Sequence, residues 1–429
     1  MNPGTAALIM LLAFILLIIL EVPIGFSLGI SGILGLILMK ESFLMFPQNL
    51  IAGINNFALL AIPFFILLGS LAEKSLLAET LIDLAEEIIG FVPGGMAAVT
   101  VFASMLFATA SGSGPATVAA IGSITIPEME KRGYSSRFAI GTAASAGALG
   151  PIIPPSIPLI IYGVVANQSI TKLFLAGLGA GLLFAFMLIV YCIFRAKADR
   201  VPVTGKRPSL KKIVTAMWKA KLALGIPLIV LGGIYSGIFT PTESGAIGCL
   251  YVILVGFIIR TLSLKDLHDA LFSAAKASAM IMFVIAAAAL FAWLMAVGRV
   301  PQIAAKAILA FSHNKVVYLI FVNILFLIIG SVLDTPAAIV IMVPILAPIA
   351  YKFGINPIHF GAVVVVNFVI GYITAPFGYN LFVAQSITGK SMEEVTAAVT
   401  PFLIICILGL LIITYVPQIT LFFPGLIGK

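Results

Sequence analysis

Long apolar segments recur along the whole chain, with short polar stretches between them. Examples are Ala6–Leu20, Leu173–Phe194, Leu250–Ile259 and Phe402–Tyr415. A helix needs about 20 mostly apolar residues to cross the hydrocarbon core of a bilayer, and the alternation typical of a transmembrane barrel is absent. Since backbone groups inside a bilayer must be hydrogen-bonded within the chain, the pattern predicts an all-α polytopic membrane protein.

Composition supports this fold class and leaves no room for a soluble domain. Hydrophobic residues make up 62% of the 429 residues, charged residues 9%, and the mean hydropathy is +1.21. A soluble protein needs far more charge to cover its surface. The net charge of +8 reports loop topology and gives no reason to expect a nucleic-acid partner. Met1–Thr5 lacks a basic n-region and a cleavage site, which favours a first membrane segment over a removed signal.

Two features bear on orientation and on cysteine chemistry. The densest basic stretch, Arg195–Lys221, contains the predicted interdomain linker Val201–Gly205. The positive-inside rule places this stretch in the cytoplasm, and counting crossings from it puts Lys131 inside and Lys352 outside. The three cysteines each lie singly in apolar runs, which favours buried hydrophobic residues over a disulfide or a metal cluster; they are Cys192, Cys249 and Cys406.

The chain contains an internal repeat at an offset of 221 residues. Without a gap, Pro115 aligns with Pro336, Pro127 with Pro348, Gly133 with Gly354, Gly150 with Gly371 and Pro155 with Pro376. By the topology above, the two copies face opposite ways. Inverted repeats with paired Gly or Pro interruptions are typical of secondary transporters with a site at the membrane midplane. Duplicated helices that only pack are the alternative.

Each copy predicts a helical hairpin. Gly94–Ala110 and Ala116–Met129 form the first, and Val316–Ile329 and Ala337–Ala350 form the second. Arms of about 14 to 17 residues are short for a full crossing. The hairpins are therefore predicted to be re-entrant, opening to the cytoplasm in copy one and to the periplasm in copy two.

Each copy also predicts a broken helix, at Gly147–Ser156 and at Gly371–Asn380, because proline removes a backbone donor and clashes with the preceding turn. Unwound backbone at membrane depth lines a cavity or is buried in protein. Its carbonyls, together with hydroxyls and one carboxylate at the hairpin tips, form an oxygen cage suited to sodium. The first predicted site comprises Ser111, Gly112, Ser113, Gly147, Gly150 and Pro154. The second comprises Asp334, Thr335, Gly371, Thr374 and Pro376.

Three charged residues have competing interpretations. Asp334 is an intramembrane carboxylate, which favours an ion-coupling role, and it also suits a helix N-cap; the two are compatible. Arg299 is either the partner of a substrate carboxylate or an interfacial arginine that snorkels. Glu243 is interpreted as part of a structural turn.

The amphipathic segment Leu71–Glu87 is predicted to lie along the membrane face, with Ala304–Phe311 as its counterpart in copy two. Such arms would connect a moving part to a static one. The predicted domains are a scaffold with an arm (1–90), transport half one (91–168), scaffold helices with linker and second arm (169–312), transport half two (313–390) and a C-terminal scaffold helix (391–429).

Three motifs, Ser111–Thr117, Gly150–Ser156 and Ala375–Gly378, strongly resemble the large membrane subunit of TRAP (tripartite ATP-independent periplasmic) transporters of bacteria. The similarity covers essentially the whole chain and implies a location in the bacterial inner membrane and no enzymatic activity. It also implies an elevator-type fold like that of the ion transporter superfamily. In such a fold, a transport domain of two hairpins and two broken helices slides against a scaffold held by arm helices.

The resemblance further implies partners and a substrate class. The expected partners are a small four-helix membrane subunit, a periplasmic substrate-binding protein and the lipid bilayer, with two or more Na+ as coupling ions. The expected substrate is an organic acid, either a C4-dicarboxylate or a sugar acid, and overall likeness favours sialic acid (N-acetylneuraminate). The implied substrate-binding residues are Ser113, Ser156 and Arg299.

Other functions remain open at this point. A passive channel and a proton-coupled carrier fit the same topology. An intramembrane serine protease would use Ser113, but it needs a base within reach. The histidines, His268, His313 and His359, all lie near predicted loops. The sequence therefore predicts a sodium-coupled importer first.

Overall fold

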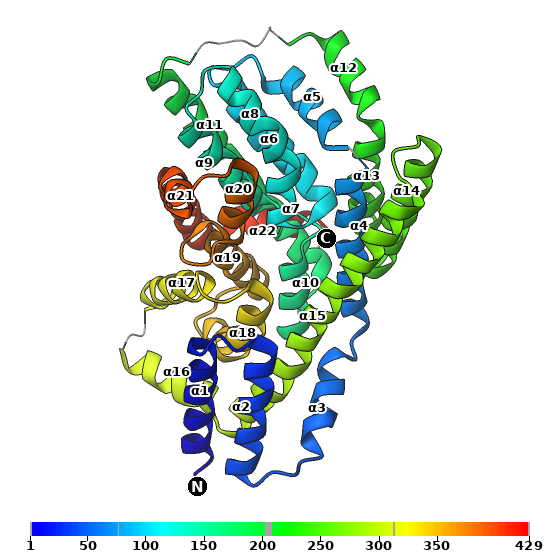
Figure 1. The fold of residues 1–429 in the computed structure, drawn as a ribbon. Helices are drawn as coiled ribbons and strands as arrows, with labels where there is room; N and C mark the ends of the chain where they lie inside the picture. The colour runs from blue at the N-terminus through cyan, green and yellow to red at the C-terminus, as the bar shows by residue number, and fades with distance from the viewer. Residues whose placement is uncertain (1, 76, 202–207, 312–313, 428–429) are drawn as a thin grey trace.

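The computed structural model describes residues 2–75, 77–201, 208–311 and 314–427. All regular elements of these ranges are helices, which confirms the predicted all-α class (Figure 1). Most of the predicted linker Val201–Gly205, as well as His313, lies outside the described residues. Cys192, Cys249 and Cys406 are buried and free, as predicted.

Six helices in the described ranges are long and apolar enough to cross a membrane. They are Phe57–Lys74, Ile170–Ala198, Pro241–Ile258, Leu264–Val297, Thr335–Lys352 and Met392–Tyr415. The pair Leu210–Lys219 and Lys221–Tyr235 passes the same test jointly and is bent by 74°. The chain therefore forms a polytopic membrane protein with at least one broken or re-entrant segment.

One group of helices packs around the long helix α15, and we call it the first bundle. Its members are α1 (Pro3–Ile19), α2 (Ile24–Met39), α3 (Met45–Ile54), α4 (Ala61–Lys74), α13 (Lys221–Tyr235), α14 (Pro241–Ile258) and α15 (Leu264–Val297). Helix α15 runs along α2, α3 and α4, and α14 packs between α4 and α13 (Figure 1).

Apart from α5, α12 and α16, which are described below, the remaining α-helices form the second bundle. Its members are α6 (Gly95–Ser111), α7 (Gly114–Thr117), α8 (Ser123–Lys131), α9 (Ser136–Ala146), α10 (Ile157–Val165), α11 (Ile170–Ala198), α17 (Lys315–Gly330), α18 (Thr335–Lys352), α19 (Pro357–Ile370), α20 (Tyr379–Thr388), α21 (Met392–Tyr415) and α22 (Pro417–Ile427). Helix α11 packs on α6, α19 and α22, and α21 packs on α9. The predicted scaffold helices α11 and α21 thus contact the predicted transport halves. The division into moving and fixed parts stays a prediction.

The C-terminal segment 391–429 was predicted to be a single helix, and the structure has two. Helix α21 ends at Tyr415, and α22 begins at Pro417. Proline lacks a backbone N–H and disfavours helical geometry in the residue before it, and Val416 indeed leaves the helical region, with φ −118° and ψ 76°. Helix α22 then turns back to pack along α11.

Short helices lie at the two ends of the molecule. Helices α5 (Leu77–Ile89) and α12 (Leu210–Lys219) lie at the top of Figure 1, and α16 (Val300–Phe311) lies at the bottom. Helix α5 contacts α6, and α16 contacts α18, so each short helix contacts one predicted hairpin. The predicted amphipathic segment Leu71–Glu87 is divided, because α4 continues through the buried Leu71 and Ala72.

An ion-pair cluster fastens α5 to the end of α8. The guanidinium of Arg132 lies 2.8 Å from Glu86 on α5 and 2.8 Å from Glu128 on α8. Burial disfavours the charged guanidinium, but the hydrogen bonds to the two carboxylates outweigh it and raise the pKa of Arg132. The first hairpin and its short helix are therefore joined by charge as well as by the chain.

The helix breaks lie where the sequence predicts them. Helix α9 ends in a 3-10 turn at Gly147–Leu149, and α10 resumes at Ile157. Helix α19 ends in a 3-10 turn at Gly371–Ile373, and α20 resumes at Tyr379. We call the unwound residues 150–156 break 1 and residues 374–378 break 2. Each break interrupts a helix of the second bundle next to one of the hairpins.

Candidate functional site

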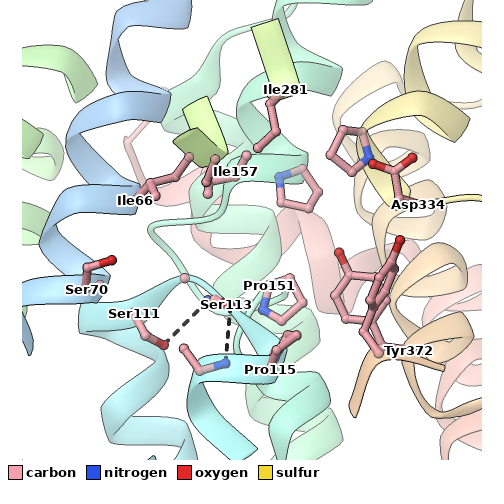
Figure 2. A pocket seen from close by; sticks show the side chains of 18 of the residues that line it. Ile66, Ser70, Ser111, Ser113, Pro115, Pro151, Ile157, Ile281, Asp334 and Tyr372 are labelled. Carbon is pink, nitrogen blue, oxygen red and sulfur yellow. Dashed lines mark hydrogen bonds between the residues drawn. The ribbon is translucent and has the colours of Figure 1, made fainter. Parts of the chain in front are cut away.

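A cavity of about 370 Å³ lies between the first bundle and the two hairpin turns, one between α6 and α7 and one between α17 and α18 (Figure 2). We call it the central cavity, the turn Ser111–Gly114 tip 1, and the turn Gly330–Thr335 tip 2. In Figure 2, α4 carries Ile66 and Ser70 on one side, tip 1 lies below, and Asp334 lies on the opposite side. Helix α15 completes the lining. The cavity therefore brings both predicted sites to the interface of the two bundles.

Tip 1 is a sharp turn whose hydroxyls are bonded within the tip and to the first turn after it. Gly112 has a φ of +58°, a backbone conformation that favours glycine. Ser113 caps α7, where its side chain accepts a 3.4 Å hydrogen bond from the Ala116 N–H. The Thr117 hydroxyl donates to the Ser113 carbonyl at 2.7 Å and lies 3.1 Å from the Ser111 hydroxyl. Tip 1 thus satisfies its own polar side chains.

Break 1 packs closely against the backbone of tip 1. A Cβ on Gly150 would clash with the Ser113 carbonyl, and a Cβ on Gly147 would lie 3.1 Å from the Gly114 carbonyl. The structure therefore brings together five of the six residues of the first predicted site. The sixth, Pro154, is buried near Gly177 on α11, and it does not line the central cavity.

Tip 2 contains a carboxylate with one oxygen that lacks a hydrogen-bond partner in the described structure. Asp334 occupies the N-cap position of α18, but its side chain makes no capping hydrogen bond. Its Oδ1 is buried and has no hydrogen-bond partner among the described residues. Asp334 lines the central cavity, and the adjacent Thr335 is 1% exposed. Asp334 therefore occupies the N-cap position as predicted, and its Oδ1 remains free to bind a ligand.

The 3-10 turn before break 2 packs on tip 2, as break 1 packs on tip 1. A Cβ on Gly371 would clash with the Gly330 carbonyl. The Thr374 hydroxyl donates to the Ile370 carbonyl at 2.8 Å. Pro376 is exposed and does not line the central cavity. Among the second predicted site, Asp334 alone lines the cavity, and the sodium-binding roles of all these residues stay predictions.

Asn380 is a candidate site residue that the sequence did not single out. It is fully buried on α20, and its Nδ2 donates to the Ala144 carbonyl at 3.0 Å. Its Oδ1 has no hydrogen-bond partner in the described structure. This oxygen faces tip 1, because a Cβ on Gly114 would lie 2.8 Å from it. In the sequence, the feature that could have identified Asn380 is a single amide side chain among apolar residues shortly after break 2.

Tyr372 contacts tip 1 and lies beside tip 2. A Cβ on Gly114 would lie 3.0 Å from its ring, and the ring lines the central cavity on the same side as Asp334 (Figure 2). It packs edge-to-face on Tyr379, with ring centroids 5.4 Å apart. Copy two of the repeat therefore supplies both Asn380 and Tyr372 to the neighbourhood of a tip in copy one.

Two residues with implied substrate roles lie away from the cavity lining. Ser156 is fully buried, where its hydroxyl donates to the Pro151 carbonyl at 2.5 Å and accepts from the Leu159 N–H. Arg299 is exposed between α15 and α16 and lines a separate cavity with Asn2. Arg299 is not among the residues that line the central cavity with Ser113, whereas Ser156 belongs to break 1, whose Pro155 carbonyl lies against tip 1, since a Cβ on Gly112 would lie 2.6 Å from it. Their substrate roles stay predictions.

Glu243 has the structural role that the sequence indicated. Its carboxylate accepts a 2.8 Å hydrogen bond from the Thr240 N–H, and its own N–H donates to the Thr240 hydroxyl at 3.3 Å. This reciprocal pair is a capping box at the start of α14.

The charge of the central cavity is negative. Glu73 on α4 and Asp334 at tip 2 both line it, and no Lys, Arg or His is among its described lining residues. Carboxylate, amide and carbonyl oxygens are the ligands of hard cations, and no group of three or more His, Cys, Asp or Glu within the described ranges has the arrangement of a metal centre. The described lining therefore offers a cation two carboxylates together with backbone and neutral oxygens, and the identity of such an ion stays a prediction.

Comparison with known proteins gives a consistent result. Residues 11–419 match the family model described as the tripartite ATP-independent periplasmic transporter, DctM component. The chain is 42% identical to the isethionate TRAP transporter permease protein DctMQ of Oleidesulfovibrio alaskensis, over 96% of this chain and 65% of that protein. It is 40% identical to the C4-dicarboxylate TRAP transporter large permease protein DctM of Pseudomonas aeruginosa, over 94% of each.

Two further matches extend the comparison. The chain is 36% identical to the sialic acid TRAP transporter large permease protein SiaM of Vibrio cholerae, over 94% of this chain and 95% of that protein. Among solved structures, the fold is similar to that of the Alcanivorax borkumensis YdaH transporter, with a TM-score of 0.60 and 16% identity over 88% of this chain and 87% of that chain. The latter similarity concerns the fold alone.

Proposed function

This chain belongs to the DctM family of tripartite ATP-independent periplasmic (TRAP) transporter large permeases, and from that premise we propose that it imports a small organic anion by sodium-coupled secondary transport. Members of this family are multi-pass proteins of the bacterial inner membrane and act as transporter permeases rather than enzymes. The open questions are the coupling ion, the mechanism, the partners and the substrate.

The observation that carries sodium coupling is a pair of buried oxygens without partners. Asp334 Oδ1 and Asn380 Oδ1 make no hydrogen bond in the described structure. Leaving a buried polar atom unpaired is costly, and a buried carboxylate costs more. A bound Na+ supplies the missing charge and coordination. We assign one Na+ to each tip: Asp334 serves the ion at tip 2, and Asn380 adds an amide oxygen to the carbonyls of tip 1 and break 1.

An elevator movement accounts for the position of the central cavity. The cavity lies at the interface of the two bundles, between helices α4 and α15 and the two tips. Contact there is close, since a Cβ on Gly69 of α4 would lie 2.7 Å from the Ser111 carbonyl. In the proposed mechanism the two inverted repeats, each with a re-entrant hairpin and a broken helix, move together along the first bundle. The short helices α5 and α16 connect the moving and fixed parts.

The proposed partners are those of a tripartite system. A periplasmic binding protein delivers the anion, and a small membrane subunit completes the membrane part. The similar permeases are named for isethionate, C4-dicarboxylate and sialic acid at 42%, 40% and 36% identity. Sialic acid, favoured by overall likeness in the sequence, is therefore one of three candidate substrates.

Uptake into proteoliposomes tests the proposal. The vesicles contain this chain, its small subunit and its binding protein, and radiolabelled isethionate, succinate or N-acetylneuraminate is added with or without an inward sodium gradient. We expect saturable uptake of one anion that requires sodium and is lost in Asp334→Ala. Uptake driven by a proton gradient alone would replace sodium as the coupling ion. Non-saturating flux without any gradient would identify a passive channel.

A further inference from the structure

The central cavity contains one carboxylate that the coupling ions do not use. Glu73 lies in the last turn of α4, on the first bundle, and it is exposed. It forms no ion pair within the part of the chain that the structure describes, where all five ion pairs lie elsewhere. The adjacent Lys74 is not among the lining residues of the cavity.

Glu73 differs from Asp334 in its exposure and in having no proposed ion beside it. Under the proposed function, a Na+ at tip 2 neutralises Asp334, whose Oδ1 is buried and needs a ligand. Glu73 belongs to the opposite wall of the cavity, where its side chain is exposed and lies outside the two tips. The two walls are close, since a Cβ on Gly69 of α4 would lie 2.7 Å from the Ser111 carbonyl, and Glu73 lies one helical turn further along α4 in the same cavity of about 370 Å³. An anion held at the tips that is long enough to span the cavity therefore places its far end at this wall.

We propose that Glu73 makes the central cavity selective for monoanions that carry a hydroxyl group at the end opposite the charge. A second carboxylate placed there meets the like charge of Glu73, with no basic residue among the described lining residues of the cavity, and such a like-charge contact discriminates strongly between ligands. A hydroxyl at the same place donates a hydrogen bond to the carboxylate, which is stronger than a bond between neutral groups. The hydroxyls of Ser70 and Ser273 line the same part of the cavity from the first bundle.

This inference rests on the proposed function, and it narrows the substrate. Isethionate carries one sulfonate and one hydroxyl, and sialic acid carries one carboxylate and several hydroxyls. Both are hydroxylated monoanions. A C4-dicarboxylate is a dianion at neutral pH and does not belong to this class, although one similar permease is named for it.

Binding to the full chain with its small subunit, purified in sodium chloride without the binding protein, tests the inference. Without the binding protein, the measured affinities report the preference of the permease and not the substrate preference of the binding protein. The ligands are isethionate, N-acetylneuraminate, succinate and monomethyl succinate, which keeps the carbon skeleton of succinate but has one charge. We expect the wild type to bind at least one hydroxylated monoanion about tenfold or more tightly than succinate. Monomethyl succinate should also bind more tightly than succinate.

Charge removal provides the decisive variant. Glu73→Gln should strengthen succinate binding and bring its affinity to within about threefold of the preferred monoanion. Glu73→Asp, which keeps the charge, should retain the discrimination. Glu79→Gln is the matched control, because Glu79 is an exposed carboxylate on α5 outside the cavity lining, and it should change nothing.

The outcomes separate this inference from the function on which it rests. Equal binding of succinate and the monoanions by the wild type overturns the inference, as does an unchanged ratio in a folded Glu73→Gln protein. In both cases sodium-dependent binding of an anion would still support the transporter. If none of these anions binds in sodium, the proposed function fails together with the inference.

Discussion

The two tips share one backbone design and differ in their chemistry. In each, a glycine allows the broken helix to touch a tip carbonyl: Gly150 in break 1, and Gly371 in the 3-10 turn before break 2. At tip 1 the hydroxyls of Ser111, Ser113 and Thr117 are hydrogen-bonded within the structure. At tip 2 the Asp334 carboxylate has an oxygen without a partner. Tip 1 therefore satisfies its own hydroxyl groups, whereas tip 2 leaves a carboxylate oxygen unpaired, which under the proposed function a bound ion pairs.

The largest expected effect comes from removing the charge at tip 2. Asp334→Asn keeps the shape of the side chain and should lower sodium-driven uptake about a hundredfold or more, because the ion loses its only anionic ligand. Without sodium, the variant should melt no earlier than the wild type, since an unpaired buried charge has been removed. The shift of melting temperature with sodium should shrink.

Ser331→Ala is the control within the same tip. The Ser331 hydroxyl is exposed and donates to the Ile328 carbonyl at 2.8 Å, so its loss should leave uptake and melting nearly unchanged. Full sodium-driven uptake by Asp334→Asn would show that tip 2 does not depend on an ion and would remove the contrast between the tips.

The shared backbone design predicts a loss of stability from a single methyl group. Gly150→Ala and Gly371→Ala each place a Cβ against a backbone carbonyl that cannot rotate away. Each should lower the free energy of unfolding by about 1–3 kcal/mol, the usual cost of overpacking. Thermal unfolding of the purified protein measures this. Gly232→Ala is the control, because its Cβ meets nothing within 4 Å, and alanine should stabilise helix α13 by about 0.5–1 kcal/mol.

Asn380 belongs to the segment after break 2, yet its side chain faces tip 1, so it connects the two tips. Asn380→Ala should raise the sodium concentration for half-maximal uptake about tenfold, since the ion at tip 1 loses one neutral ligand and keeps its carbonyls. The effect should be smaller than that of Asp334→Asn. A sodium titration of uptake checks the order, and an unchanged midpoint would exclude Asn380 from the ion site.

The smallest expected effect is at the hydrogen bonds of tip 1. Thr117→Val keeps the volume of a fully buried side chain and removes its hydroxyl, which contacts the Ser113 carbonyl and the Ser111 hydroxyl. We expect a loss of about 1 kcal/mol in the free energy of unfolding, with modest change in sodium affinity. If sodium affinity fell as far as in Asp334→Asn, tip 1 would also depend on its ion.

The sequence by itself determined the all-helical class, the helical arms around both tips and both breaks, but not the division of the C-terminal segment into α21 and α22. These depend on local causes: apolar runs of membrane length, and prolines and glycines that interrupt them. The predicted breaks at Gly147–Ser156 and Gly371–Asn380 contain the observed ones. Asp334 also stood out in the sequence, because a carboxylate within apolar segments is rare.

Only the tertiary structure decided which oxygens face which tip. Asn380 and Tyr372 lie in copy two, yet both approach Gly114 in copy one. No periodicity links segments so far apart along the chain, so their meeting follows from the packing of the second bundle. The same packing holds Ser156 as a helix cap away from the cavity lining. It also brings Glu73 of the first bundle to the cavity that the two tips line, because that cavity exists only where the bundles meet.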